Sequence, residues 1–125
     1  MPIRHTVHES GEFFIATYVG KIAANETIPA YENYYATEKD SFFLNQLVDL
    51  SKADLTEISH EELTKLASWS RNLHLERGAR KRTAIYVPES NRSAHALVYE
   101  FMSEGSLEHV MVFTSKEEAV AWLME

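Results

Sequence analysis

Ser59 is a residue whose type and position could carry a regulatory modification. It stands in "TEISHEEL", where a loop gives way to a predicted helix. A phosphate on its hydroxyl would lie at a helix N-terminus, where unpaired amides and the helix dipole favour an anion. Ser59 and Glu62 also form the capping box S-x-x-E, which explains the serine without any modification. Because Glu57, Glu61 and Glu62 would repel a phosphate, we favour the capping role over phosphorylation.

Asp49 is the second candidate, because it stands near the end of the apolar run "FFLNQLVDL". In open α/β sheets ligands bind outside the carboxyl ends of parallel strands, so Asp49 and Ser51 are candidate contacts for a ligand or partner. Asp49 could equally accept hydrogen bonds from the loop amides of Ser51 and Lys52 and fix the turn. Both roles stay open. We expect the helix caps at the same edge of the sheet to be Thr27, Ser59, Asn91 and Thr114.

Tyrosines gather on the first predicted helix, at positions 31, 34 and 35. The others lie elsewhere in the chain: Tyr18, Tyr86 and Tyr99. A tyrosine has an apolar body and a polar tip, which suits the wall of a cavity or a protein interface. A stripe at helical spacing is more often part of the core, and we favour that interpretation. Tyr31 and Tyr35 are the candidates for contact with a ligand or partner.

The histidines do not follow a metal-binding pattern. His5 and His8 are three residues apart on a predicted strand, so they face opposite sides. The others lie on separate elements: His60, His74, His95 and His109. With no cysteine, no Ser-His-Asp order and no glycine-rich phosphate loop, we predict no catalytic residue, metal or cofactor. The weakest hypothesis, an enzyme, would use Asp49 with His95, which precedes Tyr99 by one helical turn.

The composition is that of one ordinary globular domain. The chain has 125 residues, of which 45% are hydrophobic and 25% charged. It shows no repeat and no linker-like tract, so we predict a single domain over residues 1–125. No apolar segment follows "MPIRHTVHES", and no run approaches the roughly 20 apolar residues of a membrane span. We therefore expect a soluble cytoplasmic protein.

A net charge of −7 argues against general nucleic-acid binding, which needs a basic face. Five of the twelve basic residues nevertheless fall in one short window: Arg71, Arg77, Arg80, Lys81 and Arg82. Cations at the end of a helix complement its carbonyl groups and dipole, and Gly78 supplies the stop. We favour this role over a patch for an anion or a partner.

Apolar runs predict five strands, at residues 3–8, 13–20, 42–50, 83–87 and 109–113. Four helices are expected to begin at Asn25 or Thr27, at Ser59, at Ser90 or Asn91, and at Thr114 or Ser115. The first two strands form a hairpin, and the others are separated by helices, which implies parallel crossovers. The sequence therefore predicts an α/β fold with a mixed, mostly parallel five-stranded sheet and four helices.

The apolar faces of these helices predict the core. On the second helix the stripe is Leu63, Leu66, Ala67, Ser70 and Leu73, and on the third it is Ala94, Leu97, Val98, Phe101 and Met102. Six side chains across the chain should be substantially buried: Leu63, Leu66, Leu97, Phe101, Val112 and Trp122.

Three segments resemble the SpoIIAA-like family, which has the STAS fold and is related to SEC14-type lipid-binding domains. They are "YVGKI", "VDLSKAD" and "VMVFTSKEEAVAWL", and the likeness spans nearly the whole chain. The resemblance implies that a serine at the start of the helix after the third strand is a phosphorylation site, within an Asp-Ser-Ser-Gly pattern. That pattern is absent from "TEISHEE", so only Ser59 carries over.

These observations favour a non-enzymatic regulatory module that binds a protein partner, with or without phosphorylation. The alternative is a carrier of a lipid or another apolar small molecule, as the SEC14 likeness implies. Partner binding needs an exposed apolar patch, a carrier needs an enclosed apolar cavity, and an enzyme needs clustered polar groups with perturbed pKa values. We also expect a homodimer, with Met111, Trp122 and Met124 as candidate interface residues.

Overall fold

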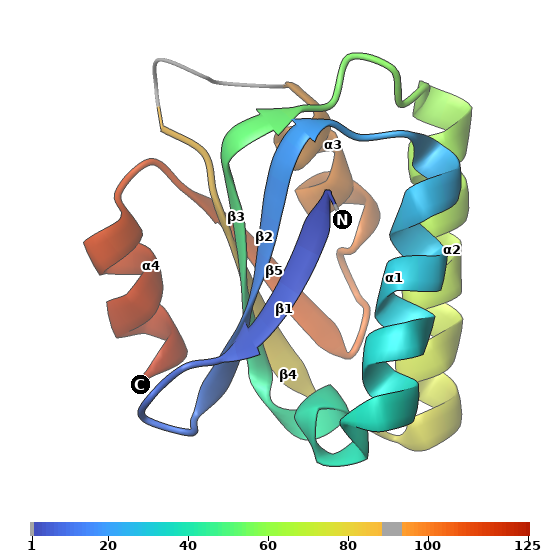
Figure 1. Ribbon diagram of the computed structural model, residues 1–125. Helices are drawn as coiled ribbons and strands as arrows, with labels where there is room; N and C mark the ends of the chain where they lie inside the picture. Colours follow the sequence, from blue (N-terminus) through green and yellow to red (C-terminus); the bar gives the residue numbers. More distant parts are fainter. Residues whose placement is uncertain (1, 89–93) are drawn as a thin grey trace.

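The computed structural model describes residues 2–88 and 94–125, and Figure 1 shows its strands and helices. The strands are β1 (Ile3–Val7), β2 (Phe13–Lys21), β3 (Asn45–Asp54), β4 (Lys81–Tyr86) and β5 (Glu108–Phe113). The helices are α1 (Ala24–Thr37), α2 (His60–Arg77), α3 (Ala94–Met102) and α4 (Lys116–Leu123), with a short 3-10 helix, η1 (Lys39–Phe43). The predicted order of strands and helices is confirmed, and η1 is an addition to it.

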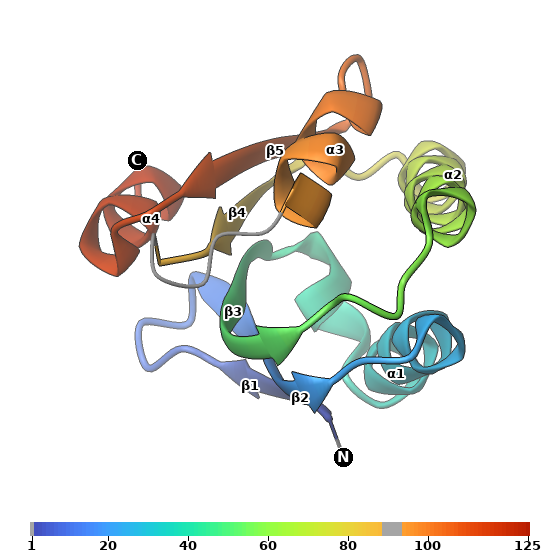
Figure 2. The ribbon, with the colours of Figure 1, turned by 90° about the horizontal axis from the view of Figure 1, so that it is seen from above.

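The five strands form one sheet in the order β1-β2-β3-β4-β5. Only β1 runs antiparallel, in the predicted hairpin with β2, and the other neighbours are parallel. Helices α1, α2 and α3 cover one face of the sheet and α4 covers the other, as the view from above shows (Figure 2). The predicted α/β class, with a mixed and mostly parallel sheet, is confirmed.

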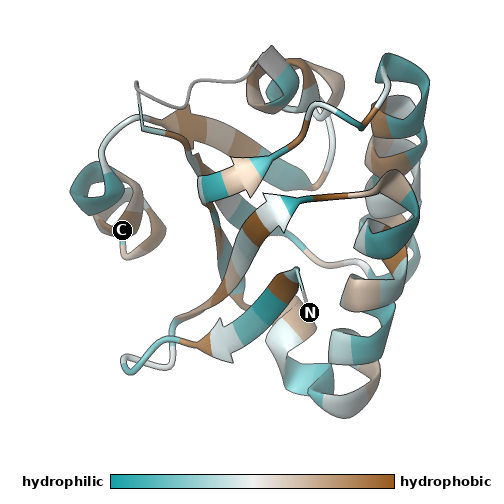
Figure 3. Cartoon of the chain, turned by 45° about the horizontal axis from the view of Figure 1, so that its top comes forward, coloured by the Kyte–Doolittle hydropathy of each residue, from teal (hydrophilic) through white to brown (hydrophobic). Residues whose placement is uncertain are grey.

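Successive strand residues point to opposite faces, and this divides the core in two. On β3, Val48 and Leu50 pack under α1–α3, whereas Leu47 packs under α4. On β2, Phe14 and Phe13 divide in the same way. Figure 3 shows the hydrophobic colouring concentrated on the central strands, with hydrophilic residues on the outward turns of α1 and α2. The three-helix face holds the larger core.

The predicted ends of α2 are confirmed. The Ser59 hydroxyl accepts the amide of Glu62 at 3.1 Å, and the Glu62 carboxyl accepts the amide of Ser59 at 2.9 Å. Ile58 and Leu63, the two positions of the hydrophobic staple, are both buried in the three-helix core. Gly78 ends the helix with φ +64°, a left-handed conformation that glycine adopts without a steric penalty.

Two predicted caps, Thr27 and Thr114, and the predicted start of β3 are wrong, and β4 begins two residues before its predicted start, at Lys81. The N-cap of α1 is Ala23, so Thr27 lies inside the helix. The N-cap of α4 is Ser115, one of its two predicted caps, and not Thr114. Glu26 takes over the role of a capping side chain by accepting the amide of Ala23 at 2.9 Å. Strand β3 begins at Asn45, because residues 42–43 belong to η1. The expected caps Ser90 and Asn91 lie outside the described residues.

The predicted buried face of α3 is only partly confirmed, because Val98 and Met102 pack against the core whereas two other members of the face do not. Leu97 is 41% exposed and Phe101 is 72% exposed, whereas Ala96 and Ser103 are buried. The helix is apolar on more than one side, so the periodicity of its sequence did not determine which side faces the core. A polar contact fixes the orientation, because the Tyr99 hydroxyl donates to the Glu108 carboxyl at 3.3 Å.

The other core predictions differ in degree. Leu63 is buried as expected. Leu66, Val112 and Trp122 are half-buried, so their predicted burial is only partly confirmed. On α2, Leu73 was predicted to face the core but is only half-buried, and the next residue, His74, is buried instead.

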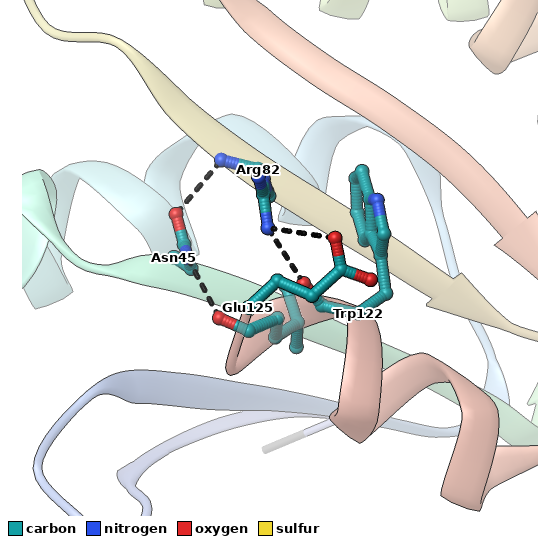
Figure 4. Close-up of polar contacts among 5 residues, drawn as sticks. Asn45, Arg82, Trp122 and Glu125 are labelled. Carbon is teal, nitrogen blue, oxygen red and sulfur yellow. Dashed lines mark hydrogen bonds and ion pairs between the residues drawn. The ribbon is translucent and has the colours of Figure 1, made fainter.

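Helix α4 is held to the sheet through the ends of its backbone (Figure 4). The Asn45 amide group donates to the Leu123 carbonyl at 3.0 Å and accepts the Arg82 backbone amide at 2.8 Å. The Arg82 guanidinium donates to the Trp122 carbonyl at 2.8 Å and pairs with Glu125 at 3.8 Å. Carbonyl groups that the last turn leaves unpaired are thus bound by side chains of β3 and β4.

Within residues 2–88 and 94–125, no helix has the length and apolar character needed to cross a bilayer.

Candidate functional site: an internal cavity

A cavity of about 90 Å³ lies between the sheet and helices α1, α2 and α3. Its floor is made by the strand residues that point toward those helices, namely Tyr18, Gln46, Val48, Leu50, Thr83, Ile85 and Glu108. Its walls are mainly apolar and include Leu63, Leu66 and Leu73 of α2. The alternation of the strands therefore places both apolar and polar side chains on the cavity.

The lining residues of α2 run from Leu63 to His74. At a rise of 1.5 Å per residue, these eleven steps cover roughly 16 Å along the helix. The lining of the cavity is therefore extended along α2. Such a shape suits an unbranched chain better than a ring.

Glu108 is the most heavily hydrogen-bonded residue of the cavity floor. Its carboxyl group accepts the hydroxyl groups of Ser70 at 2.9 Å, Thr83 at 2.5 Å and Tyr99 at 3.3 Å. Three donors satisfy a buried acid that would otherwise be costly to remove from water. The three hydroxyl groups come from α2, β4 and α3, so Glu108 also joins the elements that enclose the cavity.

A second set of polar groups joins α1 to the sheet. The Tyr31 hydroxyl donates to the Gln46 side-chain oxygen at 2.6 Å, and the Tyr18 hydroxyl lies 2.9 Å from the Tyr31 oxygen. Since the Tyr31 proton goes to Gln46, Tyr18 donates to Tyr31. Burial raises the pKa of Tyr18 and of Tyr31 well above the ordinary value, so both tyrosines are neutral donors.

Two residues that line the cavity each have a buried polar atom without a hydrogen-bond partner among the described residues: Thr27 (Oγ1) and His74 (Nε2). Both residues are only 3% exposed. His74 Nδ1 lies 2.7 Å from the Ser70 carbonyl oxygen, which can only accept, so Nδ1 carries the proton and Nε2 offers a lone pair. Burial lowers the pKa of His74, which favours this neutral form.

Lys81 is a buried cation close to the cavity. Its ammonium group donates to the Tyr35 hydroxyl and to the Phe42 carbonyl, each at 3.3 Å, and lies 5.0 Å from the centre of the Phe14 ring. Burial lowers its pKa to about 8, against the charge of Glu108, which acts in the opposite direction. Lys81 and Glu108 are partners in the pairing of β4 with β5, so two buried charges begin neighbouring strands.

The structure divides the predicted site residues among three places. Tyr31 and Tyr35 line the cavity. Asp49 lies on the face covered by α4, where it contacts Lys116, and Ser51 follows it at an irregularity of β3. Ser59 is exposed at the start of α2. These five residues therefore do not form one site, and a contact of any of them with a ligand or partner stays a prediction.

Asp49 does fix the local backbone, as one of its two predicted roles required. Its carboxyl accepts the Ser51 amide at 2.9 Å and the Lys116 ammonium at 3.3 Å. Burial alone would raise the pKa of Asp49, but the hydrogen bonds from Ser51 and Lys116 lower it below the ordinary value. Asp49 cannot act together with His95, because His95 lies on the other side of the sheet and donates to the Ile58 carbonyl at 2.8 Å.

The tyrosine pattern predicted part of the cavity. Tyr18, Tyr31, Tyr35 and Tyr99 line it. Tyr34 instead donates to the Ser41 hydroxyl at 3.0 Å, and Tyr86 packs near α4.

Other lining residues were missed. His74 continues the buried positions 63, 67 and 70 of α2 at helical spacing, and that signal could have placed it on the cavity. Glu108 gave no signal, since an acid beside an apolar run is usually exposed. Thr27 was assigned to a cap. Among the described residues, no group of three or more His, Asp or Glu side chains is placed to hold a metal ion.

No protein-family model matches the chain, and no curated protein matches its sequence. An uncharacterized protein of the DUF3478 family from Shewanella loihica, whose crystal structure has a SpoIIAA-like fold, is similar in structure. The similarity covers 97% of this chain and 91% of that chain, with a TM-score of 0.57 and 18% sequence identity. The protein therefore has a SpoIIAA-like fold, as its sequence segments implied. At this identity the likeness shows the fold alone.

Proposed function

We propose that the protein is a binding module for a small amphipathic molecule, which lies in the internal cavity. Its ligand has an unbranched apolar body and a hydroxyl group that donates to His74 Nε2. The pair of buried, unpartnered atoms, Thr27 Oγ1 and His74 Nε2, is the observation that carries this proposal. A buried polar group without a partner costs about 1–3 kcal/mol of stability, and most buried polar groups in folded proteins are paired.

The size of the cavity limits its ligand. A cavity of about 150 Å³ accommodates benzene, and sites for drug-sized molecules have volumes of roughly 300 Å³ or more. At about 90 Å³, this cavity takes a ligand of a few non-hydrogen atoms without rearrangement. A longer chain requires the side chains between α1 and α2 to move apart.

The test is a comparison of 1-octanol with its methyl ether, which has the same chain but no donor. We expect calorimetry to show that the wild-type protein binds the alcohol at least five-fold more tightly. His74→Phe should abolish this preference, and Thr27→Val should weaken it. Thr64→Val, which changes an exposed threonine of α2, is the matched control. Equal affinity for alcohol and ether, or a preference that persists in His74→Phe, would count against the proposal.

A protein partner remains a second candidate, because α3 exposes Leu97 and Phe101 one turn apart. Partner binding requires an exposed apolar patch, and exposed apolar side chains on one helix face provide such a patch. A pull-down from native lysate with the wild type and with Leu97→Ser/Phe101→Ser tests it. Capture of the same proteins by both forms would exclude α3 as the partner surface.

A further inference from the structure

We propose that the groove between α1 and α2 is the entrance to the cavity and binds the carboxylate of an aliphatic hydroxy acid. This inference rests on the proposed function and names the class of its ligand. The acid lies with its carboxylate in the groove, its hydroxyl on His74 and its chain in the cavity.

The groove has a volume of about 440 Å³. It is lined by Glu32, Tyr35, Ala36, Lys39, Phe43, Trp69, Leu73 and Arg77. Tyr35, Trp69 and Leu73 line the internal cavity as well. These three side chains therefore form the boundary, or wall, that the groove and the cavity share.

The wall is apolar over most of its area and lies at the surface. Trp69 and Leu73 are half-buried and stand four residues apart, on one face of α2. A change of their side-chain rotamers joins the groove to the cavity while the backbone hydrogen bonds of α2 stay in place. A rotamer change moves fewer atoms than a collective motion of helices, which makes this route faster than separation of the helices.

The charges of the groove select an anion. Lys39 and Arg77 are exposed cations on it, and Glu32 is its one acid among the lining residues. This local excess of positive charge contrasts with the net charge of −7 of the whole chain. The Arg77 guanidinium lies 4.6 Å from the centre of the Phe42 ring, which limits the directions in which it can point. Cations beside an apolar wall match a carboxylate that continues into a hydrocarbon chain.

The spacing on α2 places the hydroxyl near the carboxylate. Arg77 lies on the groove, and His74, three residues before it, lies on the cavity. Residues three apart on a helix have Cβ atoms about 5–6 Å from each other. A hydroxyl on the third carbon of the acid can thus reach His74 Nε2 while the carboxylate stays with Arg77. A simple fatty acid would leave His74 Nε2 without a donor.

The probes are 3-hydroxydecanoate, decanoate and 1-decanol, used below the concentrations at which they form micelles. Binding is followed through the fluorescence of Trp69 in a Trp122→Phe background, since these are the two tryptophans of the chain. We expect 3-hydroxydecanoate to bind at least ten-fold more tightly than either of the others. Replacing Lys39 and Arg77 by glutamine should remove the advantage of 3-hydroxydecanoate over 1-decanol.

Two further variants test the groove itself. Arg80→Gln is the matched control, because Arg80 is an exposed cation near the end of α2 that does not line the groove. It should bind all probes like the wild type. Ala36→Trp fills the groove at an exposed position and should slow the association of every probe at least ten-fold, with an unchanged melting temperature.

The outcomes separate this inference from the proposed function. If 1-decanol binds and depends on His74, but the Lys39/Arg77 variant keeps the preference for 3-hydroxydecanoate, the groove is not the carboxylate site. An unchanged association rate in Ala36→Trp would mean that the groove is not the entrance to the cavity. If no probe binds the wild-type protein, the cavity itself is not a binding site, and both proposals fail.

Discussion

At the scale of single residues, the three-helix face of the sheet carries more polar groups than a core needs. Glu108 receives three hydroxyl donors, whereas Thr27 and His74 each keep an atom without a partner among the described residues. The contrast matters because a satisfied buried network rigidifies a fold, and an unsatisfied atom is a cost that a ligand can remove. The first group therefore has a structural role, and the second is the basis of the proposed site.

Lys81 gives a pH dependence with a definite sign. Its pKa is about 8 in the folded protein and 10.5 ordinarily. Between these values the unfolded chain binds a proton at this lysine and the folded chain does not, so Lys81 makes stability rise with pH. We expect the free energy of unfolding of the wild type, relative to Lys81→Met, to increase between pH 8 and pH 10. Urea melts at half-unit steps measure it, and a flat or falling difference would contradict the assignment.

At the scale of elements, apolar residues of α2 and α3 differ in burial although both were predicted to face the core. Leu63→Ala should lower the free energy of unfolding by about 2–5 kcal/mol, since Leu63 is buried. Leu97→Ala should change it by less than about 1 kcal/mol, because Leu97 is 41% exposed. Denaturant melts of both variants check the orientation of α3. Equal losses would mean that Leu97 faces the core.

The start of α2 allows a separate prediction. Ser59→Ala removes the acceptor of the Glu62 amide and should cost about 0.5–2 kcal/mol. Ser59→Asp should keep the stability, since aspartate is a good N-cap and its charge suits the helix dipole. Thermal melts of both variants decide this. If Ser59 is a phosphorylation site instead, Ser59→Ala melts like the wild type and Ser59→Asp alone loses a partner in a pull-down from native lysate.

At the scale of the whole molecule, local patterns determined the elements but not the site. Alternation along β3 and the capping box at Ser59 are short-range signals, and both predicted the structure well. The cavity depends on which residues of distant elements meet. Thr27 was interpreted as a helix cap because a threonine before an apolar stripe is common at caps, and only the fold shows it inside α1. Glu108 and Ser70 are 38 residues apart and meet through the crossover of α3.

Association of two copies is the prediction at this scale. Met111 and Met124 are 36% and 41% exposed, and Met111 pairs with Ala84, whose side chain packs under α4. Exposed apolar side chains near one face suit a symmetric dimer, which is the commonest oligomer. We expect light scattering to show a dimer at high micromolar concentration, and Met111→Lys/Met124→Lys to be monomeric. Leu75→Lys, on α2, is the control. A monomeric wild type would contradict the prediction.

The Asn45 side chain joins α4 to β4, so a chemical change of its amide group would weaken this connection. Spontaneous deamidation of Asn45 would turn its donor nitrogen into a carboxylate oxygen, facing the Leu123 carbonyl that the amide now binds. The new carboxylate oxygen would repel the Leu123 carbonyl oxygen at the end of α4, where the amide now donates a hydrogen bond (Figure 4). Replacing Asn45 by aspartate should therefore loosen the α4 face first. The cavity, enclosed by other helices on the opposite side of the sheet, would keep its shape for longer.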